Sequence, residues 1–316
     1  MSATRIPWID AASLRQALPW PHVVDTLESA IRDGASRRDL PPRTGVPVTA
    51  GELLLMPAEV GVDVGVKVVS VHDGSAGPAV PRIQGVHVAF DGVTLAPTAV
   101  LEARTLTLLR TAGLSALAVR HLAPGPARSL ALFGTGPQSV AHALAIDSVR
   151  PLEHVWVIGR RPESVETVVE QLGDAGIAAV SGTPADIASA DIVACCTTAA
   201  DPLFDSRALR PQATVVAVGS HSPTRREVDA ALVRRATVIV ESRPSALTEA
   251  GDIVIAIDDG VPAGTAIDGD LGDLVRGDVT IHTDRPRLFK SVGEAWADVV
   301  VASAAVREVL ASTAVV

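Results

Sequence analysis

One stretch, residues 129–140, constrains the fold more than any other part of the chain. Its apolar run Leu130–Phe133 has the length of a buried strand and is followed by two glycines, Gly134 and Gly136. Pro137 suits the first turn of a helix, and the residues after it have helical spacing. Glycine permits a tight turn, and the amides at the start of a helix attract an anion. The stretch therefore predicts a strand, a tight turn and a helix around a phosphate site.

The two glycines match the start of the G-x-G-x-x-G fingerprint of dinucleotide-binding proteins, with Ser139 in the place of the third glycine. A glycine-rich turn in another kind of α/β protein is the alternative, because a fold alone does not define a function. A bound pyrophosphate is expected to contact the residues of the turn, which are Gly134, Thr135, Gly136, Pro137 and Gln138.

Beyond this stretch, apolar runs of strand length alternate with helical patterns, which is typical of a parallel sheet. The order predicts an α/β fold with a Rossmann-type doubly wound parallel sheet. Strands are expected at 130–133, 155–158, 177–180, 191–196, 213–218, 237–241 and 279–282. Helices are expected at 138–147, 162–172, 226–235 and 294–310.

The region before residue 101 has a different pattern. Short β-rich runs divided by Pro and Gly predict a mostly antiparallel sheet, preceded by an amphipathic helix at 22–31. At 316 residues the chain is long enough for two domains. We expect an antiparallel α+β domain at 1–120, completed by a C-terminal helix at 292–316. The dinucleotide-binding domain is expected at 121–291.

Composition excludes several classes of ligand. A net charge of −9 and an isoelectric point near 5.4 disfavour nucleic acid and anionic membranes as partners. The only cysteines, Cys195 and Cys196, are adjacent in an apolar run, which suits a buried strand in a reducing compartment. With no signal-like N-terminus and no membrane-spanning run, we expect a cytoplasmic protein with a small ligand. The histidines show no metal-binding spacing, so no metal is expected.

The residues after the second strand of the dinucleotide domain bear on the choice of cofactor. An acidic residue there usually binds the ribose 2′-hydroxyl of NAD, but this chain has Gly159, Arg160 and Arg161. Two arginines without a carboxylate favour the 2′-phosphate of NADPH over NADH. Solvated charges at the start of a helix are the alternative explanation.

Two further residues stand out as candidates for chemistry. Alternation along residues 66–71 places Lys67 and Val69 on one face of a strand, so one lysine points where an apolar neighbour points. His221 follows the carboxyl end of a parallel strand, where open α/β sheets place their ligands, and histidine titrates near neutral pH. A lysine with its head in water and an ordinary loop histidine are the alternatives.

Several short motifs, in order along the chain, resemble the ornithine cyclodeaminase/μ-crystallin family. They are Pro42-Arg43-Thr44, Leu54-Leu55-Met56-Pro57, Gly65-Val66-Lys67-Val68-Val69-Ser70-Val71, Arg110-Thr111-Ala112, Gly134-Thr135-Gly136-Pro137-Gln138, Arg226-Glu227-Val228-Asp229 and Phe289-Lys290-Ser291-Val292-Gly293. The resemblance implies that the domain at 1–120, with the helix at 292–316, is a substrate-binding and dimerisation domain. It would bind an α-amino or α-imino acid and pair with a second copy in a homodimer. It also implies that the substrate carboxylate is held by Arg43, Lys67 and Arg110.

The resemblance extends to the cofactor, for which additional contacts are expected from Arg110, Thr111, Thr197, Ser220 and Ser291. Two positions depart from the cyclodeaminases, which have an Asp where this chain has His221 and a Glu where it has Leu54. Without these two carboxylates, the chain lacks an obvious partner for the distal amino group of ornithine.

We therefore expect an NADPH-dependent reductase of small α-imino acids, of the ketimine or Δ1-pyrroline-2-carboxylate type. Lys67 or His221 would donate the proton to the imine. An ornithine cyclodeaminase-like or alanine dehydrogenase-like enzyme and a non-catalytic ligand-binding protein remain as alternatives.

Overall fold

The computed structural model of the chain describes residues 6–37, 43–75, 77 and 80–313. It divides into two compact units, which are described separately below. The first unit consists of Met1–Arg110 and Glu294–Val316, and the second consists of Thr111–Gly293. Helix α3, Ala103–Leu122, begins in the first unit and continues into the second.

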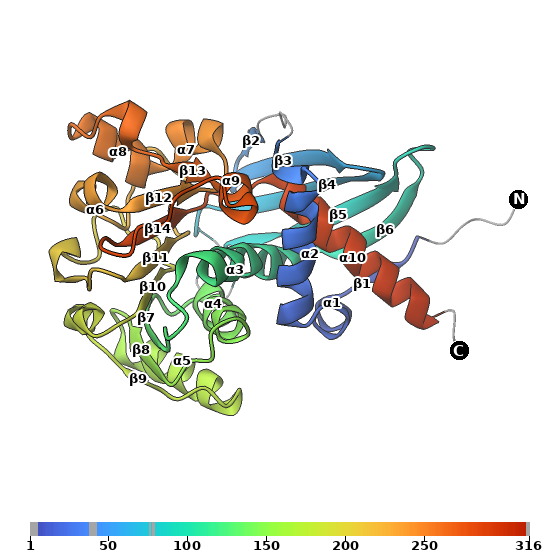
Figure 1. Cartoon of the computed structure of the whole chain (residues 1–316). Helices are drawn as coiled ribbons and strands as arrows, with labels where there is room; N and C mark the ends of the chain where they lie inside the picture. The colour runs from blue at the N-terminus through green and yellow to red at the C-terminus, as the bar shows by residue number, and fades with distance from the viewer. Residues whose placement is uncertain (1–5, 38–42, 76, 78–79, 314–316) are drawn as a thin grey trace, which may run out of the picture. The chain divides into compact units, whose positions relative to one another are not determined.

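A six-stranded sheet forms the centre of the first unit (Figure 1). Its strand order is β1-β6-β5-β4-β3-β2, and every pairing is antiparallel except that of β1 with β6. The strands are β1 Trp8–Ile9, β2 Thr44–Val48, β3 Gly51–Val60, β4 Asp63–His72, β5 Ile83–Asp91 and β6 Pro97–Glu102.

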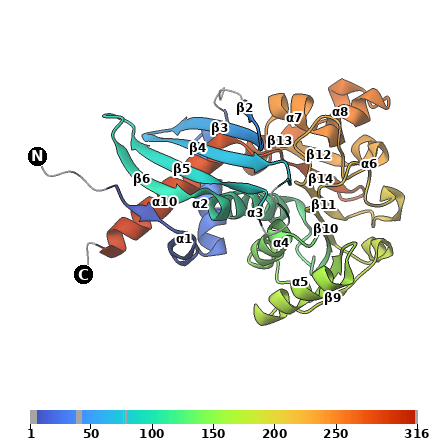
Figure 2. The same ribbon diagram turned by 180° about the vertical axis from the view of Figure 1, so that it is seen from behind.

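One face of this sheet is covered by helix α10, Ala295–Thr313, which crosses β3, β4 and β5. Met56 and Ala58 of the sheet pack there against Ala295 and Val299. Seen from behind, the strands lie in front of the helix (Figure 2). The remaining helices are α1 Ala11–Ala17, α2 Trp20–Arg32 and the 3-10 turn η1 Ala35–Arg37, and both α1 and α2 contact α10.

The second unit is built on an eight-stranded sheet in which all pairings are parallel. Its order is β13-β12-β14-β11-β10-β7-β8-β9, so the chain runs outward in one direction from β7 and then resumes on its other side at β10. The strands are β7 Ser129–Phe133, β8 His154–Ile158, β9 Ala179–Ser181, β10 Ile192–Cys195, β11 Thr214–Ala217, β12 Thr237–Val240, β13 Gly269–Asp270 and β14 Arg287–Lys290. Such a reversal of strand order marks the usual ligand-binding point of a doubly wound sheet.

The connections between these strands contain α-helices and 3-10 turns. Those that precede β11 are α4 Pro137–Asp147, α5 Pro162–Asp174, η2 Pro184–Ala188 and η3 Ser206–Ala208. Those that follow it are α6 Ala230–Arg235, α7 Arg243–Glu249, α8 Gly251–Asp258, η4 Ala263–Thr265 and α9 Leu271–Arg276. The fold class predicted from the sequence, a doubly wound parallel sheet plus an antiparallel α+β part, is confirmed.

Two expected elements are wrong in detail. No strand forms at 279–282, and the last strand of the sheet is β14, whose ends are the charged residues Arg287 and Lys290. The helix expected at 226–235 begins only at Ala230, because Asp229 is its N-cap residue, with an extended backbone and a side chain that accepts from the Leu232 N–H at 2.8 Å.

Candidate functional site

The turn after β7 lies at the reversal of strand order in the second unit. Gly134 has a φ of +111°, which side-chain-bearing residues rarely adopt, and an added Cβ would lie 2.5 Å from the carbonyl oxygen of Cys196. Its N–H donates to the carbonyl of Ile158 at 2.9 Å, so the turn is held against strands β10 and β8. Only glycine fits this position.

The start of α4 has the features of an anion site. Gly136 is its N-cap residue, no side chain caps the helix, and Pro137 occupies its first turn. A Cβ on Gly136 would meet nothing within 4 Å, so the backbone is open to close approach. The uncapped amides and the dipole of the helix favour negative charge at this position. These residues fit the pyrophosphate of a dinucleotide.

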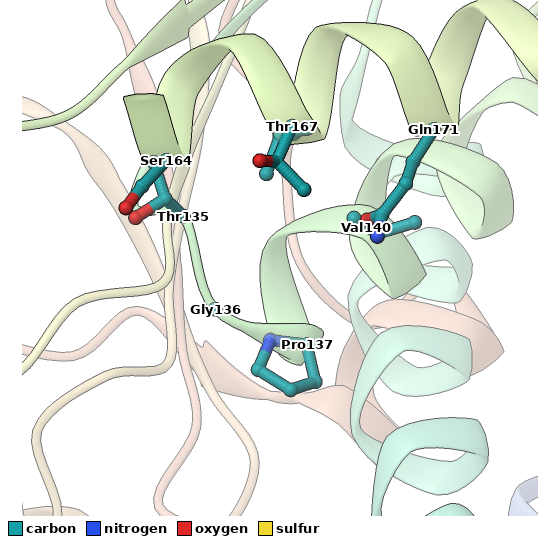
Figure 3. A pocket seen from close by; sticks show the side chains of 8 residues that line it. Thr135, Gly136, Pro137, Val140, Ser164, Thr167 and Gln171 are labelled. Atoms are coloured by element: carbon teal, nitrogen blue, oxygen red, sulfur yellow. The ribbon is translucent and has the colours of Figure 1, made fainter. Parts of the chain in front are cut away.

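A cavity of about 390 Å³ lies between this turn and helix α5 (Figure 3). Thr135 and Gly136 line it from the turn, while Ser164, Thr167 and Gln171 line it from α5. Figure 3 shows the hydroxyls of Thr135 and Ser164 at the same end of this cavity. The exposed residues Gly159, Arg160 and Arg161 connect β8 to α5 beside these side chains.

A buried ion pair holds the turn that carries His221 in place. Lys290, at the carboxyl end of β14, places Nζ 2.7 Å from Oδ2 of Asp252, and both side chains are fully buried. The same Nζ donates to the carbonyl of Ser220 at 2.7 Å. A lysine therefore ties the backbone next to His221 to helix α8. His221 itself is exposed.

Glu227 also holds the turn that carries His221 in place. One oxygen of its buried carboxylate accepts from the amide and the hydroxyl of Thr197 at 2.7 and 2.8 Å, and the other accepts from the Gly219 N–H at 2.7 Å. Burial raises the pKa of Glu227, and the nearby Lys290 opposes that shift. The ends of β10 and β11 are thus joined by one side chain.

Several residues expected to contact the cofactor use their hydroxyls within this framework. Thr197 donates to Glu227, Ser220 donates to the carbonyl of Arg225 at 2.7 Å, and Ser291 donates to Glu241. Thr111 differs, because its hydroxyl is buried without a hydrogen-bond partner among the described residues. The cofactor roles of these four residues stay predictions.

In the first unit, two buried cations share one buried carboxylate. Nζ of Lys67 on β4 lies 2.6 Å from Oδ2 of Asp298 on α10, and Nε of Arg110 lies 3.2 Å from Oδ1. Lys67 is 1% exposed, Arg110 is 6% exposed and Asp298 is fully buried. Nη1 of Arg110 is also buried and has no hydrogen-bond partner in the described part of the chain. The cluster therefore carries more positive than negative charge and retains an unused donor.

Burial and neighbouring charges shift the pKa values of this cluster. Burial, with Arg110 and Arg43 nearby, lowers the pKa of Lys67 to about 8, although Asp298 acts to raise it. Burial acts to raise the pKa of Asp298, but Lys67 and Arg110 outweigh it and hold that pKa below its ordinary value. Lys67 is thus an ammonium whose proton is held less tightly than that of an exposed lysine.

Asp298 and His87 were missed in the sequence. His87 on β5 is the cross-strand neighbour of Lys67, and neither ring nitrogen has a hydrogen-bond partner among the described residues. Burial lowers the pKa of His87 to about 4, so its ring is neutral at physiological pH. Only the alternating pattern of β5 could have indicated that His87 faces the same side as Lys67.

The predicted site residues thus fall into two groups. Lys67 and Arg110 lie together, and Arg43 is half-buried and acts electrostatically on Lys67. The glycine turn, the two arginines after β8 and the His221 turn belong to the second unit.

In the described ranges, no cluster of His, Cys, Asp or Glu could hold a metal ion, and no helix is long and apolar enough to span a membrane.

Solved structures and curated proteins place this arrangement in a known class. The fold is similar to that of Δ1-pyrroline-2-carboxylate reductase from Thermococcus litoralis in complex with NADH and L-proline. The TM-score is 0.91 with 26% identity over 98% of each chain. The fold and the reductases to which the chain is similar define an NAD(P)-dependent oxidoreductase.

The chain belongs to the ornithine cyclodeaminase/mu-crystallin family, whose model matches residues 11–314. It is 32% identical to Δ1-pyrroline-2-carboxylate reductase of Bacillus cereus over 93% of this chain and 94% of that protein. It is also 30% identical to mouse ketimine reductase mu-crystallin over 89% of this chain and 90% of that protein. The resemblance noted from the sequence motifs is confirmed.

The Lys290 ion pair leads to a prediction about stability. Lys290→Met leaves the Asp252 carboxylate buried and unpaired, which should lower the free energy of unfolding by about 3–5 kcal/mol. The double variant Lys290→Met/Asp252→Asn should recover part of that loss, because the charge of the Asp252 carboxylate is removed together with its cation. Urea denaturation measures both variants.

Arg210→Met is the control, because it breaks the partly exposed Arg210–Asp191 pair of the same unit. Its cost should stay within about 1 kcal/mol. If Lys290→Met costs no more than this control, the buried pair does not hold the turn.

Proposed function

We propose that this protein is an NADPH-dependent reductase of small α-imino acids, of the ketimine or Δ1-pyrroline-2-carboxylate type. The observation that carries the proposal is the buried pair of Lys67 and Arg110. Among the described residues, this pair shares one carboxylate, that of Asp298, and a guanidinium nitrogen of Arg110 has no hydrogen-bond partner. Such an excess of positive charge suits a carboxylate ligand, and each charge-assisted contact contributes about 1.5–3 kcal/mol. The names of the relatives support the same class of substrate.

Each ligand is assigned to residues of one unit. Lys67, Arg110 and Arg43 bind the substrate carboxylate and thereby orient the C2 atom of the substrate. Fixing C2 in this way makes hydride transfer effectively intramolecular. The turn at Gly134 and Gly136 holds the pyrophosphate of the cofactor. When bound, the nicotinamide supplies the hydride.

Protonation of the imine nitrogen makes C2 electrophilic, and two residues are candidates for the donor. Lys67 has a pKa of about 8, so it is protonated at neutral pH and can release its proton. His221 is exposed on a turn that Lys290 and Glu227 fasten. We favour Lys67, because its ammonium also lies within the cationic cluster.

NADPH oxidation against a panel of cyclic imino acids and of 2-oxo acids with amines tests the reaction. Lys67→Met should lower kcat/KM on the best substrate by more than about 100-fold, because it removes both a carboxylate contact and a proton. NADPH affinity should stay near the wild-type value, because the pyrophosphate rests on other residues.

His221→Asn tests the second donor, and His282→Asn serves as its control because His282 is another exposed histidine of the same unit. Near wild-type kcat/KM in Lys67→Met would leave His221 as the donor. Ammonia release without net NADPH consumption would indicate a cyclodeaminase. Cofactor binding without turnover on any substrate would indicate a ligand-binding protein.

The preference for NADPH rests on the residues after β8. Arg160 and Arg161 are exposed beside the cavity that Thr135 and Ser164 line, and no acidic residue ends the strand. Arg160→Ala with Arg161→Ala should weaken NADPH binding at least about tenfold and leave NADH binding within about twofold. Calorimetric titration with both cofactors measures the change.

Arg207→Ala with Arg210→Ala is the matched control, because it removes two arginines with exposed side chains from the same unit. It should leave both affinities unchanged. An unaltered preference for NADPH in the Arg160/Arg161 variant would show that the 2′-phosphate is bound elsewhere.

We further propose that the protein is a homodimer that pairs through the sheet of the first unit. The face opposite α10 presents half-exposed apolar side chains from three neighbouring strands, namely Leu55, Val66, Val68, Val86, Val88 and Phe90. Strand β2 beside them is exposed throughout and leaves an edge for pairing. A second copy would cover both. Light scattering should give twice the chain mass at micromolar concentration, and a monomer there would contradict the proposal.

A cytoplasmic location is proposed on chemical grounds. Cys195 and Cys196 are free thiols, and burial raises the pKa of both, so neither is a ready nucleophile for disulfide exchange. Free cysteines are typical of proteins in a reducing compartment.

A further inference from the structure

The chain has two lysines, and both are buried beside an aspartate. Of the 27 lysines and arginines in the chain, only Lys67 and Lys290 are lysines. Each is 1% exposed and lies against a fully buried aspartate, at 2.6 Å for Asp298 and at 2.7 Å for Asp252. Arginine serves at every other cationic position, so lysine is retained only where the cation is buried.

The difference between the two residue types is chemical. The guanidinium of arginine does not lose its proton in proteins, whereas a buried lysine changes its protonation state readily. A buried ammonium also costs several kcal/mol unless a carboxylate lies beside it. A lysine at position 67 is therefore useful as a proton donor only if a neighbouring group keeps it charged.

Asp298 has the geometry for that role. Its two oxygens contact different cations, Oδ2 facing Lys67 and Oδ1 facing Nε of Arg110. Of the other described groups that act on Lys67, Arg43 and Arg110 repel the ammonium and His87 is neutral. The stabilising charge on Lys67 thus comes from helix α10.

We propose that Asp298 is the positioning residue of the substrate site, holding Lys67 and Arg110 side by side and keeping Lys67 protonated before the substrate carboxylate arrives. This inference rests on the proposed reductase function for its catalytic consequence. Because Asp298 offsets only one of the two cations, the cluster still attracts an anion. Nη1 of Arg110 provides an unused donor for that anion.

The small number of lysines allows a direct test that does not depend on activity. Full-length protein labelled with ¹³C at lysine should give two ε-methylene signals, and Lys67→Met assigns them. Asp298→Asn should lower the pKa of Lys67 by about 1–3 units, because an opposite charge at this distance favours the ammonium. The Lys290 ε-methylene signal should keep its wild-type chemical shift, which shows that the second unit is intact.

Asp63→Asn is the matched control. It removes the Asp63–Arg307 pair, which joins the same strand and helix at an exposed position 3.1 Å across. It should leave the pKa of Lys67 unchanged. A Lys67 pKa that stays within about 0.3 units of the wild type in Asp298→Asn overturns the proposal.

Two further variants keep the test valid if Asp298→Asn does not fold. Arg110→Met removes one cation, and Arg110→Met/Asp298→Asn restores the wild-type net charge of the cluster. The pKa of Lys67 should be about 1–3 units lower in the double variant than in the single one. Equal values in the two proteins overturn the proposal.

The pH profile separates this inference from the proposed function. If Lys67 is the donor, the basic limb of kcat/KM on an imino acid should move to lower pH by the same number of units in Asp298→Asn. Activity should then recover toward the wild-type value as the pH falls, which a packing defect would not produce. If the wild type reduces no imino acid, the proposed function fails, but the lysine titration still decides the role of Asp298.

Discussion

Buried charge compensation is the constraint on which both halves of the protein depend. In the first unit the Lys67–Asp298 pair ties strand β4 to helix α10, and in the second the Lys290–Asp252 pair ties strand β14 to helix α8. Ion pairs of this kind add little net stability compared with apolar side chains of similar size. We interpret them as devices that fix where a backbone turn or a cation lies, and both adjoin candidate functional residues.

The sequence was most informative where short-range physics decides the structure. The strand, turn and helix at 129–147 follow from an apolar run, two glycines and a proline, and the structure has β7 and α4 there. Ser139, the unusual third residue of the fingerprint, is fully buried, and its hydroxyl lies 2.9 Å from where a Cβ on Gly134 would be. A small side chain is tolerated at this position, so the departure from glycine did not alter the fold.

Long-range partners explain what the sequence could not show. Asp298 lies in the helix expected at 294–310, and its carboxylate is buried against Lys67, whose strand is far away in the sequence. Strand β14 was missed because charged residues flank its two apolar ones, and its pairing with β11 and β12 determines its place. No local pattern records any of these contacts.

The placement of both lysines in the interior also affects the reactivity and the charge of the protein surface. Both ε-amino groups are shielded, so amine-directed reagents and enzymes that acylate lysine find no exposed lysine side chain on the native protein. The cations on its surface are arginines, and guanidinium groups keep their charge in alkali, where lysines would begin to lose it. The positive charge of the surface therefore resists both chemical modification and a rise in pH, while the two lysine amines lie in the interior.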